Sequence, residues 1–86
     1  MTLVKGDIAA QAEQVFTNLA AIAKAAGGTL NNAVKVNISL TDLSDFDAVN
    51  TVMASHFEAP YPARACVQVV ALPRGADIEV EAILVL

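Results

Sequence analysis

The sequence lacks several features on which whole classes of proteins depend. Its single cysteine, Cys66, cannot form a disulfide within the chain and has no partners for a zinc site. No run of about 18 apolar residues occurs, because charged side chains interrupt both halves of the chain, and this excludes a transmembrane helix. Residues 1–7 lack the cationic and apolar regions of a secretory signal, so we expect a cytoplasmic protein.

Charged residues are also scarce. They form 16% of the chain, and the net charge is −4. The five basic residues are scattered and have no aromatic side chains among them: Lys5, Lys24, Lys35, Arg64 and Arg74. A nucleic-acid partner is therefore not expected.

Hydrophobic residues, by contrast, are abundant, at 56% of the 86 residues. That length permits one domain, residues 1–86. A chain so short buries only about two thirds of the surface that it exposes when unfolded. The apolar composition therefore predicts that part of the burial occurs between subunits of an oligomer.

The first half of the chain shows a helix pattern and then a strand pattern. After Asp7, apolar residues recur every three or four positions, which predicts a helix of about five turns. Asp7 is a suitable N-cap, and Gly27-Gly28 is a suitable stop. Residues 34–41 then alternate between apolar and polar side chains, as in a half-buried strand.

The second half predicts a helix over residues 45–57, with Ser44 and Asp47 resembling a capping box. Residues 63–70 and 77–86 predict two strands, and the turn between them is short enough to reverse the chain. The order αβαββ indicates an α+β fold, with two helices on one face of a mixed β-sheet.

If the helices cover the apolar face of the sheet, polar side chains fill the other face. They are Lys35, Asn37, Ser39, Arg64, Cys66, Gln68, Glu79 and Glu81. On adjacent antiparallel strands, about 4.8 Å apart, such side chains can converge. One interpretation is a cross-strand salt bridge on a solvated face.

The other interpretation is a site for a small carboxylic acid. Arg64 offers a planar fork of donors that matches a carboxylate through two bonds. A carboxylate nearby can orient a water or move a proton. Together these groups suggest hydrolysis of a small carboxylic acid.

Other polar residues are weaker candidates. Cys66 has no histidine placed to deprotonate it, so we expect it to line a pocket rather than attack a substrate. Asn50 lies on the second predicted helix and either faces solvent or turns toward the sheet edge. His56 and Ser55 are adjacent on that helix and point too far apart to form a catalytic pair.

Three acidic residues, Asp42, Asp45 and Asp47, resemble the start of a calcium-binding loop. The loop lacks the required glycine, and its twelfth position is Met53 rather than Glu. We therefore expect caps in a solvated loop, and no metal site.

The sequence contains three ordered motifs near its end. They are Pro62-Ala63-Arg64-Ala65-Cys66-Val67, Leu72-Pro73 and Ile78-Glu79-Val80-Glu81-Ala82. Together they resemble the signature of the RidA (YjgF-type) enamine/imine deaminases. Shorter upstream segments such as Thr41-Asp42-Leu43 and Val49-Asn50 follow the same pattern, so the resemblance runs from about Gly6 to the end.

The resemblance implies a chorismate-mutase-like fold and a homotrimer whose sheets form a central barrel, with a pocket at each subunit interface. It implies hydrolysis of reactive 2-imino or enamine acids to 2-keto acids and ammonia, without a cofactor. Arg64 would bind the substrate carboxylate, and Glu79 would position the attacking water. Cys66 would line the pocket, and Asn50 would belong to its polar surroundings.

Two departures from the family pattern matter. The usual N-terminal strand pair, with a pocket tyrosine and a serine-containing segment, is absent, so the chain is expected to be N-terminally truncated. A non-catalytic carboxylate-binding or regulatory oligomer and an inactive fragment therefore stay open as alternatives. Val70 also stands where the family usually has a small residue, on the predicted face of Arg64 and Cys66, which predicts a narrower pocket.

Overall fold

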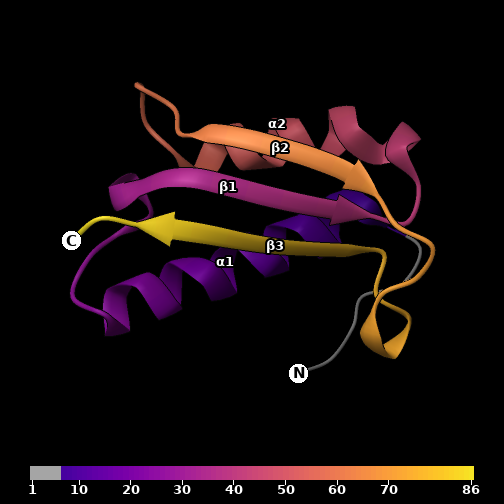
Figure 1. Ribbon diagram of the computed structural model, residues 1–86, viewed down its shortest axis with the longest axis horizontal. Coiled ribbons are helices and arrows are strands. Elements are labelled where there is room, and N and C mark those ends of the chain that lie inside the picture. The colour runs from indigo at the N-terminus through magenta and orange to yellow at the C-terminus, as the bar shows by residue number, and fades with distance from the viewer. Residues whose placement is uncertain (1–6) are drawn as a thin grey trace.

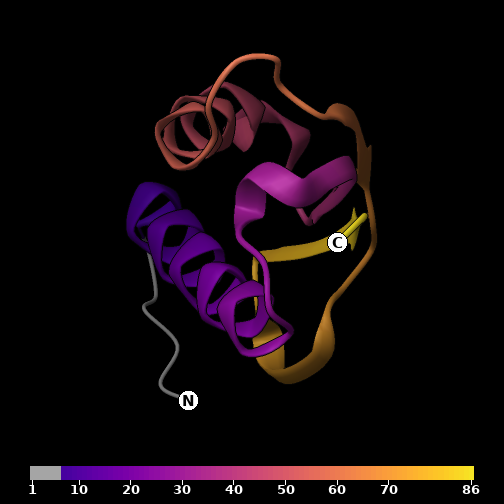
Figure 2. The same cartoon turned by 90° about the vertical axis from the view of Figure 1, so that its left-hand side faces the viewer.

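The computed structural model of the chain describes residues 7–86, which form two layers (Figures 1 and 2). Two helices, α1 (Ile8–Ala25) and α2 (Phe46–His56), cover one face of a three-stranded sheet. The strands are β1 (Ala33–Leu40), β2 (Ala63–Gln68) and β3 (Ile78–Leu84). The predicted α+β fold, with its order αβαββ and a mixed sheet, is confirmed.

Two predictions reach outside the described residues. The absence of a secretory signal concerns residues 1–7, and the family pattern begins at Gly6. Within residues 7–86, neither α-helix combines the length and the hydropathy needed to span a membrane.

α1 begins and ends as predicted. Asp7 is its N-cap, because the Asp7 Oδ1 accepts a hydrogen bond of 3.2 Å from the backbone N–H of Ala10. At the other end Gly27 takes a φ of 95°, which a residue without Cβ adopts at no steric cost. The N–H of Gly28 then donates to the carbonyl of Ala23 at 3.0 Å and closes the helix.

The start of α2 differs from the prediction, because Ser44 and Asp47 do not form a capping box. Asp45 is its N-cap, with no hydrogen bond from the side chain. The cap forms one turn earlier, where Asp42 Oδ1 accepts from the N–H of Ser44 at 3.0 Å and from its hydroxyl at 2.7 Å. These two bonds lower the pKa of the Asp42 carboxyl.

Across residues 7–86, no three His, Cys, Asp or Glu side chains are grouped to hold a metal ion.

β1 is the central strand of the sheet. β2 joins it in parallel after the crossover through α2, and β3 pairs with its other side in antiparallel. The predicted hairpin of β2 and β3 is therefore wrong. Residues 69–77 instead cross the end of β1, where the N–H of Val69 donates to Leu40 at 2.8 Å and that of Thr41 donates to Asp77 at 3.2 Å.

The burial of β1 explains this strand order. Val36, Ile38 and Leu40 are at most 1% exposed, and a strand with such a row is stabilised by a neighbour on either side. β2 is exposed except at Cys66 and suits an edge. Val34, which the alternation assigns to the same row, is half exposed because the pairing with β3 is irregular at that point.

Phe16 lies at the centre of the contact between the two helices. It is fully buried, with the ring of Phe57 edge-on at 6.2 Å and that of His56 stacked at 5.6 Å. The Nε2 of His56 lies 2.8 Å from Glu13 Oε1, which links α2 to α1. His56 therefore pairs with a residue of α1. As expected, it does not pair with Ser55, whose hydroxyl donates to the carbonyl of Val52 instead.

Replacing Phe16 tests this packing. Phe16→Ala should lower the free energy of unfolding by about 3–5 kcal/mol, because the vacated space lies between two helices and the sheet. The matched control is Ile22→Ala on the same helix, where the side chain is 65% exposed and the change should stay within about 0.5 kcal/mol. Urea denaturation measures both, and equal effects would contradict the buried position of Phe16.

Candidate active site

Arg64 and Cys66 lie on the side of the sheet that the helices cover. In the parallel pairing of β2 with β1, Arg64 is in register with Val36 and Cys66 with Ile38. Residues in register point to the same face of a sheet, and Val36 and Ile38 point into the core. The prediction that Arg64 and Cys66 belong to the open polar face is therefore wrong.

The edge position of β2 explains why polar side chains tolerate that side. Among the residues of β2, Cys66 alone is partly buried. Arg64 can pack its aliphatic stem against the protein and still keep the guanidinium in solvent. The alternation of residue types alone does not distinguish such a polar rim from an open polar face.

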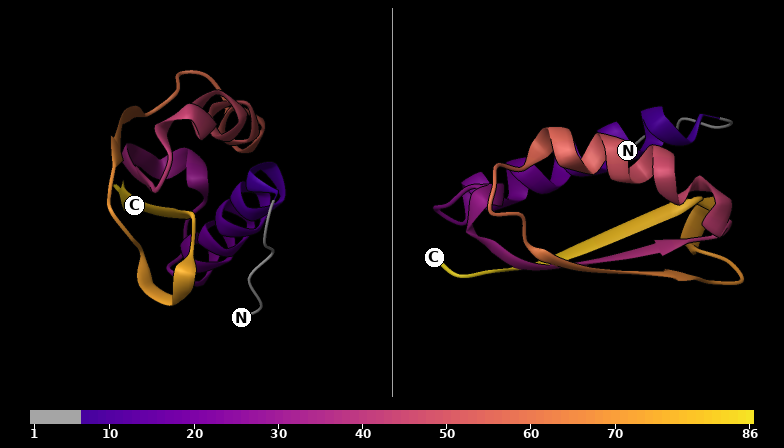
Figure 3. Two further views of the ribbon diagram at one scale, coloured as in Figure 1. Left: turned by 90° about the vertical axis from the view of Figure 1, so that its right-hand side faces the viewer. Right: turned by 90° about the horizontal axis from the view of Figure 1, so that it is seen from above.

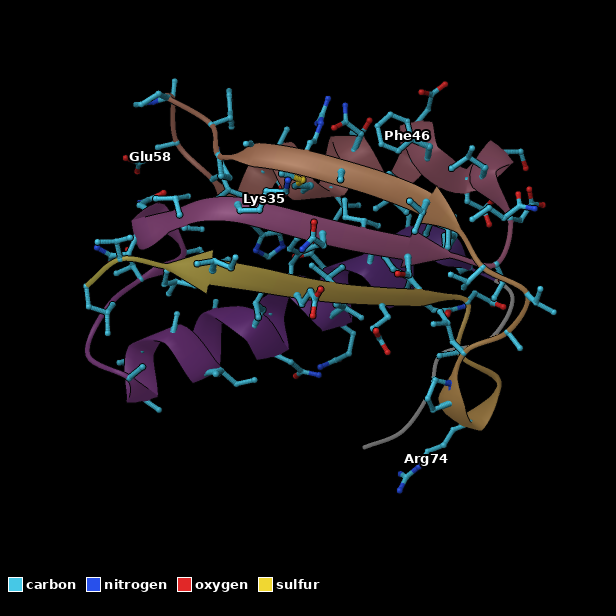
Figure 4. All side chains as sticks on the ribbon, viewed as in Figure 1. Lys35, Phe46, Glu58 and Arg74 are labelled. Atoms are coloured by element: carbon cyan, nitrogen blue, oxygen red, sulfur yellow. The ribbon has the colours of Figure 1, made fainter. Side chains whose placement is uncertain are left out.

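The guanidinium of Arg64 lies over the ring of Phe46, the first residue of α2. The distance from the Arg64 Cζ to the ring centroid is 5.5 Å, within the range of a cation–π contact. Figure 4 shows Phe46 on α2, beside β2. Arg64 forms no ion pair with any residue of the described chain, so the interpretation as a salt bridge to Glu79 or Glu81 is wrong.

Two open hollows flank Arg64 along the α2–β2 seam, the line where α2 meets β2. The first has a volume of about 480 Å³ and is lined by Leu43, Ser44, Phe46, Asp47, Arg64 and Cys66. The second has a volume of about 430 Å³ and is lined by Asn50, Met53, Ala54, Tyr61, Pro62 and Arg64. Arg64 lines both hollows. Each hollow is large enough for a small carboxylic acid.

Asn50 turns toward the sheet, which was one of its two predicted orientations. It lines the second hollow beside Arg64. Its Oδ1 is buried and has no hydrogen-bond partner within residues 7–86. A buried acceptor left without a donor costs about 1–3 kcal/mol, so a donor brought by a ligand would be favoured at this point.

Cys66 lines the first hollow. Burial raises the pKa of its thiol, and the positive charge of Arg64 opposes this rise only in part. The thiol is therefore protonated at neutral pH and is a weak nucleophile. Its position favours a role in lining the hollow over nucleophilic catalysis.

Glu79 lies on the opposite face of the sheet. In the antiparallel pairing Glu79 is in register with Ser39, and Glu81 with Asn37, whose Nδ2 donates to Glu81 Oε1 at 3.3 Å. Because β1 separates β3 from β2, the backbones of Glu79 and Arg64 are also two strand spacings apart, about 10 Å across the sheet, and their partners Ser39 and Val36 are three residues apart along β1. Glu79 and Arg64 of one chain therefore cannot hold the same small molecule.

Two residues of the α2–β2 seam were not indicated as site residues by the sequence pattern. Phe46 fits the apolar period of α2, a pattern that predicts a core residue, but it is only partly buried. Tyr61 lies between two prolines after α2 and is 58% exposed on the second hollow. A large aromatic residue held between prolines was the available signal. Val70 is fully exposed beyond β2 and lines neither hollow, so it does not narrow either hollow within one chain.

Comparisons with known proteins agree with one another. The chain matches, over residues 1–86, the family model described as "Endoribonuclease L-PSP". It is 47% identical over 83 residues to the 2-iminobutanoate/2-iminopropanoate deaminase of Bos taurus. The aligned residues cover 96% of this chain and 61% of that protein. The chain belongs to the RidA (YjgF-type) family. It spans about 60% of the length of the curated relatives that it matches.

Solved structures of other proteins resemble the chain closely. The crystal structure of RidA from an Antarctic Psychrobacter superposes with a TM-score of 0.95 at 57% identity, over 100% of this chain and 69% of that one. The structure of E. coli TdcF with bound serine gives 0.86 at 38% identity, over 95% and 67% of the two chains. The predicted RidA-like fold is thereby confirmed.

The thiol of Cys66 offers a test of the site's electrostatics. Its alkylation by iodoacetamide should be slow at neutral pH and should rise through a midpoint above that of a free cysteine, because burial raises the pKa. Arg64→Ala removes the charge that opposes this shift, so the midpoint should rise further. Arg74→Ala is the matched control, since Arg74 points away from the body of the molecule in Figure 4. Mass spectrometry across a pH series measures all three, and a lower midpoint in Arg64→Ala would contradict the arrangement.

Proposed function

We propose that the chain carries the site of a 2-imino acid deaminase, which hydrolyses reactive 2-imino or enamine acids to 2-keto acids and ammonia. The main support is the guanidinium of Arg64, which is free of ion pairs to residues 7–86 and stands beside a hollow of suitable size. The names of several relatives, 2-iminobutanoate/2-iminopropanoate deaminase, support the same reaction.

In the proposed reaction, Arg64 binds the carboxylate of the imino acid through two parallel hydrogen bonds. Water adds to the imine carbon, the carbon–nitrogen bond breaks, and the nitrogen leaves as ammonia with protons from the water. A carboxylate positions this water, and Glu79 is the proposed residue. Cys66 and Asn50 complete the walls, and the reaction calls for no cofactor.

Because Glu79 and Arg64 of one chain lie on opposite faces, the proposed site combines Arg64 with the partner subunit's Glu79. We propose a homotrimer with one such site at each interface. The open face of the sheet supports close packing of subunits. This is the face away from both helices in Figure 3. It carries Ala63, Ala65 and Val67 on β2 and Ile83 on β3, and Val67 and Ile83 are more than half exposed.

The description of the family model, "Endoribonuclease L-PSP", names an activity on RNA as an alternative. The net charge of −4 and the five scattered basic residues give that alternative no support. The cytoplasm remains the proposed compartment.

Two alternatives use the same residues without turnover. One is a carboxylate-binding or regulatory oligomer, and the other is an inactive part of a longer deaminase, since the chain spans about 60% of its relatives. Ammonia release from a freshly generated imino acid distinguishes the proposed enzyme from both. Thermal stabilisation by a keto acid without ammonia release would favour the carboxylate-binding oligomer.

The carboxylate fork makes Lys a poor substitute for Arg. Arg64→Lys keeps the charge but loses the two parallel bonds, so it should weaken binding of 2-oxobutanoate by about 1.5–3 kcal/mol, almost as much as Arg64→Ala. Titration calorimetry measures the affinities, and thermal melts verify that both variants stay folded. Near-normal affinity in the Lys variant would exclude the fork.

Subunit mixing tests the shared site. Arg64→Ala and Glu79→Gln should each reduce ammonia release by about 10²-fold or more. Trimers assembled at random from equal amounts of the two variants should regain about one quarter of the parent activity, because about one interface in four joins an intact Arg64 to an intact Glu79. The separate variants, measured at the same total concentration, are the control. Mixtures as inactive as the separate variants would contradict a site made by two subunits.

A further inference from the structure

We propose that Phe46 is a positioning residue for Arg64, holding the guanidinium so that its N–H groups face a bound carboxylate. This inference rests on the proposed function, because it assigns Arg64 to a carboxylate. It assigns to Phe46 a task beyond helix packing. Phe46 acts on the ligand through Arg64.

The surroundings of Arg64 support this role. Arg64 lies on an edge strand and is exposed, so its long side chain has rotational freedom to lose on binding a ligand. Within residues 7–86 it forms no ion pair that would hold the guanidinium. The ring of Phe46, with its centroid 5.5 Å from Cζ, is the contact that restrains it.

The contact also leaves the hydrogen-bonding groups of Arg64 available. A cation is attracted to the face of an aromatic ring by the ring's quadrupole, and this attraction uses no N–H donor of the guanidinium. A carboxylate partner such as Asp or Glu would occupy the same donors that the substrate needs. An aromatic support therefore holds the guanidinium without competing with the substrate.

Phe46 is itself held against the strand that carries Arg64. The turn before α2 is tied to the end of β2, because Gln68 Oε1 accepts a hydrogen bond of 2.9 Å from the backbone N–H of Leu43. Gln68 is in register with Leu40, so it lies on the same face of β2 as Arg64. The ring of Phe46 also packs against the core. The ring and the guanidinium thus lie on two segments that a hydrogen bond holds together, and this fixes their relative position.

A double-mutant cycle measures the coupling between the two residues. Phe46→Leu keeps an apolar side chain but loses the ring, and it should weaken binding of 2-oxobutanoate by roughly three- to five-fold. Phe46→Tyr keeps the ring and should bind within about two-fold of the parent. In an Arg64→Ala background, Phe46→Leu should have no further effect, because the residue through which it acts is gone.

A second measurement is independent of any ligand. The ring current of Phe46 should shift the NMR signals of the Arg64 side-chain protons upfield, and the shift should disappear in Phe46→Leu and persist in Phe46→Tyr. Leu43→Ala, which alters the same hollow without removing the ring, should leave the shift in place.

The outcomes separate the two proposals. If Phe46→Leu weakens binding equally with and without Arg64, or if Arg64 shows no ring-current shift, the positioning role is overturned while the deaminase proposal stands. If the parent chain does not bind 2-oxobutanoate at all, the proposed function fails for this chain. The ring-current shift then decides on its own whether Phe46 places Arg64.

Discussion

The side chains of Val36, Ile38 and Leu40 are almost completely removed from solvent, and this one row determines what the neighbouring strands can present. Because successive residues of a strand point to opposite faces, burying the row on β1 fixes the faces of every residue in register with it. Arg64 is in register with the buried Val36 and therefore faces the helices. Glu79 is in register with Ser39, between two buried residues, and therefore faces away from them. The chemistry available to one chain follows from this packing of three aliphatic side chains.

The elements themselves were predictable because each has a strong local signal. The helix period and the caps at Asp7 and Gly27 marked α1, and the period of two marked β1. The strand order was not predictable in this way, because a short connection favours a hairpin unless a buried central strand competes for both partners. The face of Arg64 was missed for a related reason. β2 carries small apolar residues on one side and polar residues on the other. Which of these sides faces the helices depends on the register of β2 with β1. The motifs indicated Arg64, Cys66 and Asn50 together, and the fold brings these three to one seam.

The two sides of the sheet present different chemistry. Among residues 7–86, the helix side offers a cation without an ion pair, a protonated thiol and a buried amide oxygen without a hydrogen-bond partner. The open side offers carboxylates and exposed aliphatic side chains. In the proposed site, the binding groups and the water-positioning group are thus kept apart until two subunits meet. Such an arrangement also prevents Arg64 and Glu79 of one chain from neutralising each other, which their direct pairing would do.

The connection of residues 69–77 across the end of β1 also bears on how the chain acquires its fold. Both outer strands dock on β1 and neither docks on the other, so each requires contacts between segments far apart in sequence. Closing such loops has an entropic cost that must be met before the native contacts form, and folds with distant strand pairings are generally slow to assemble. A defect in β1 removes the template for both partners at once, whereas a defect in β2 or β3 leaves the remaining pair able to form. The central strand is therefore where a substitution should most strongly retard folding, even though it carries none of the proposed catalytic groups.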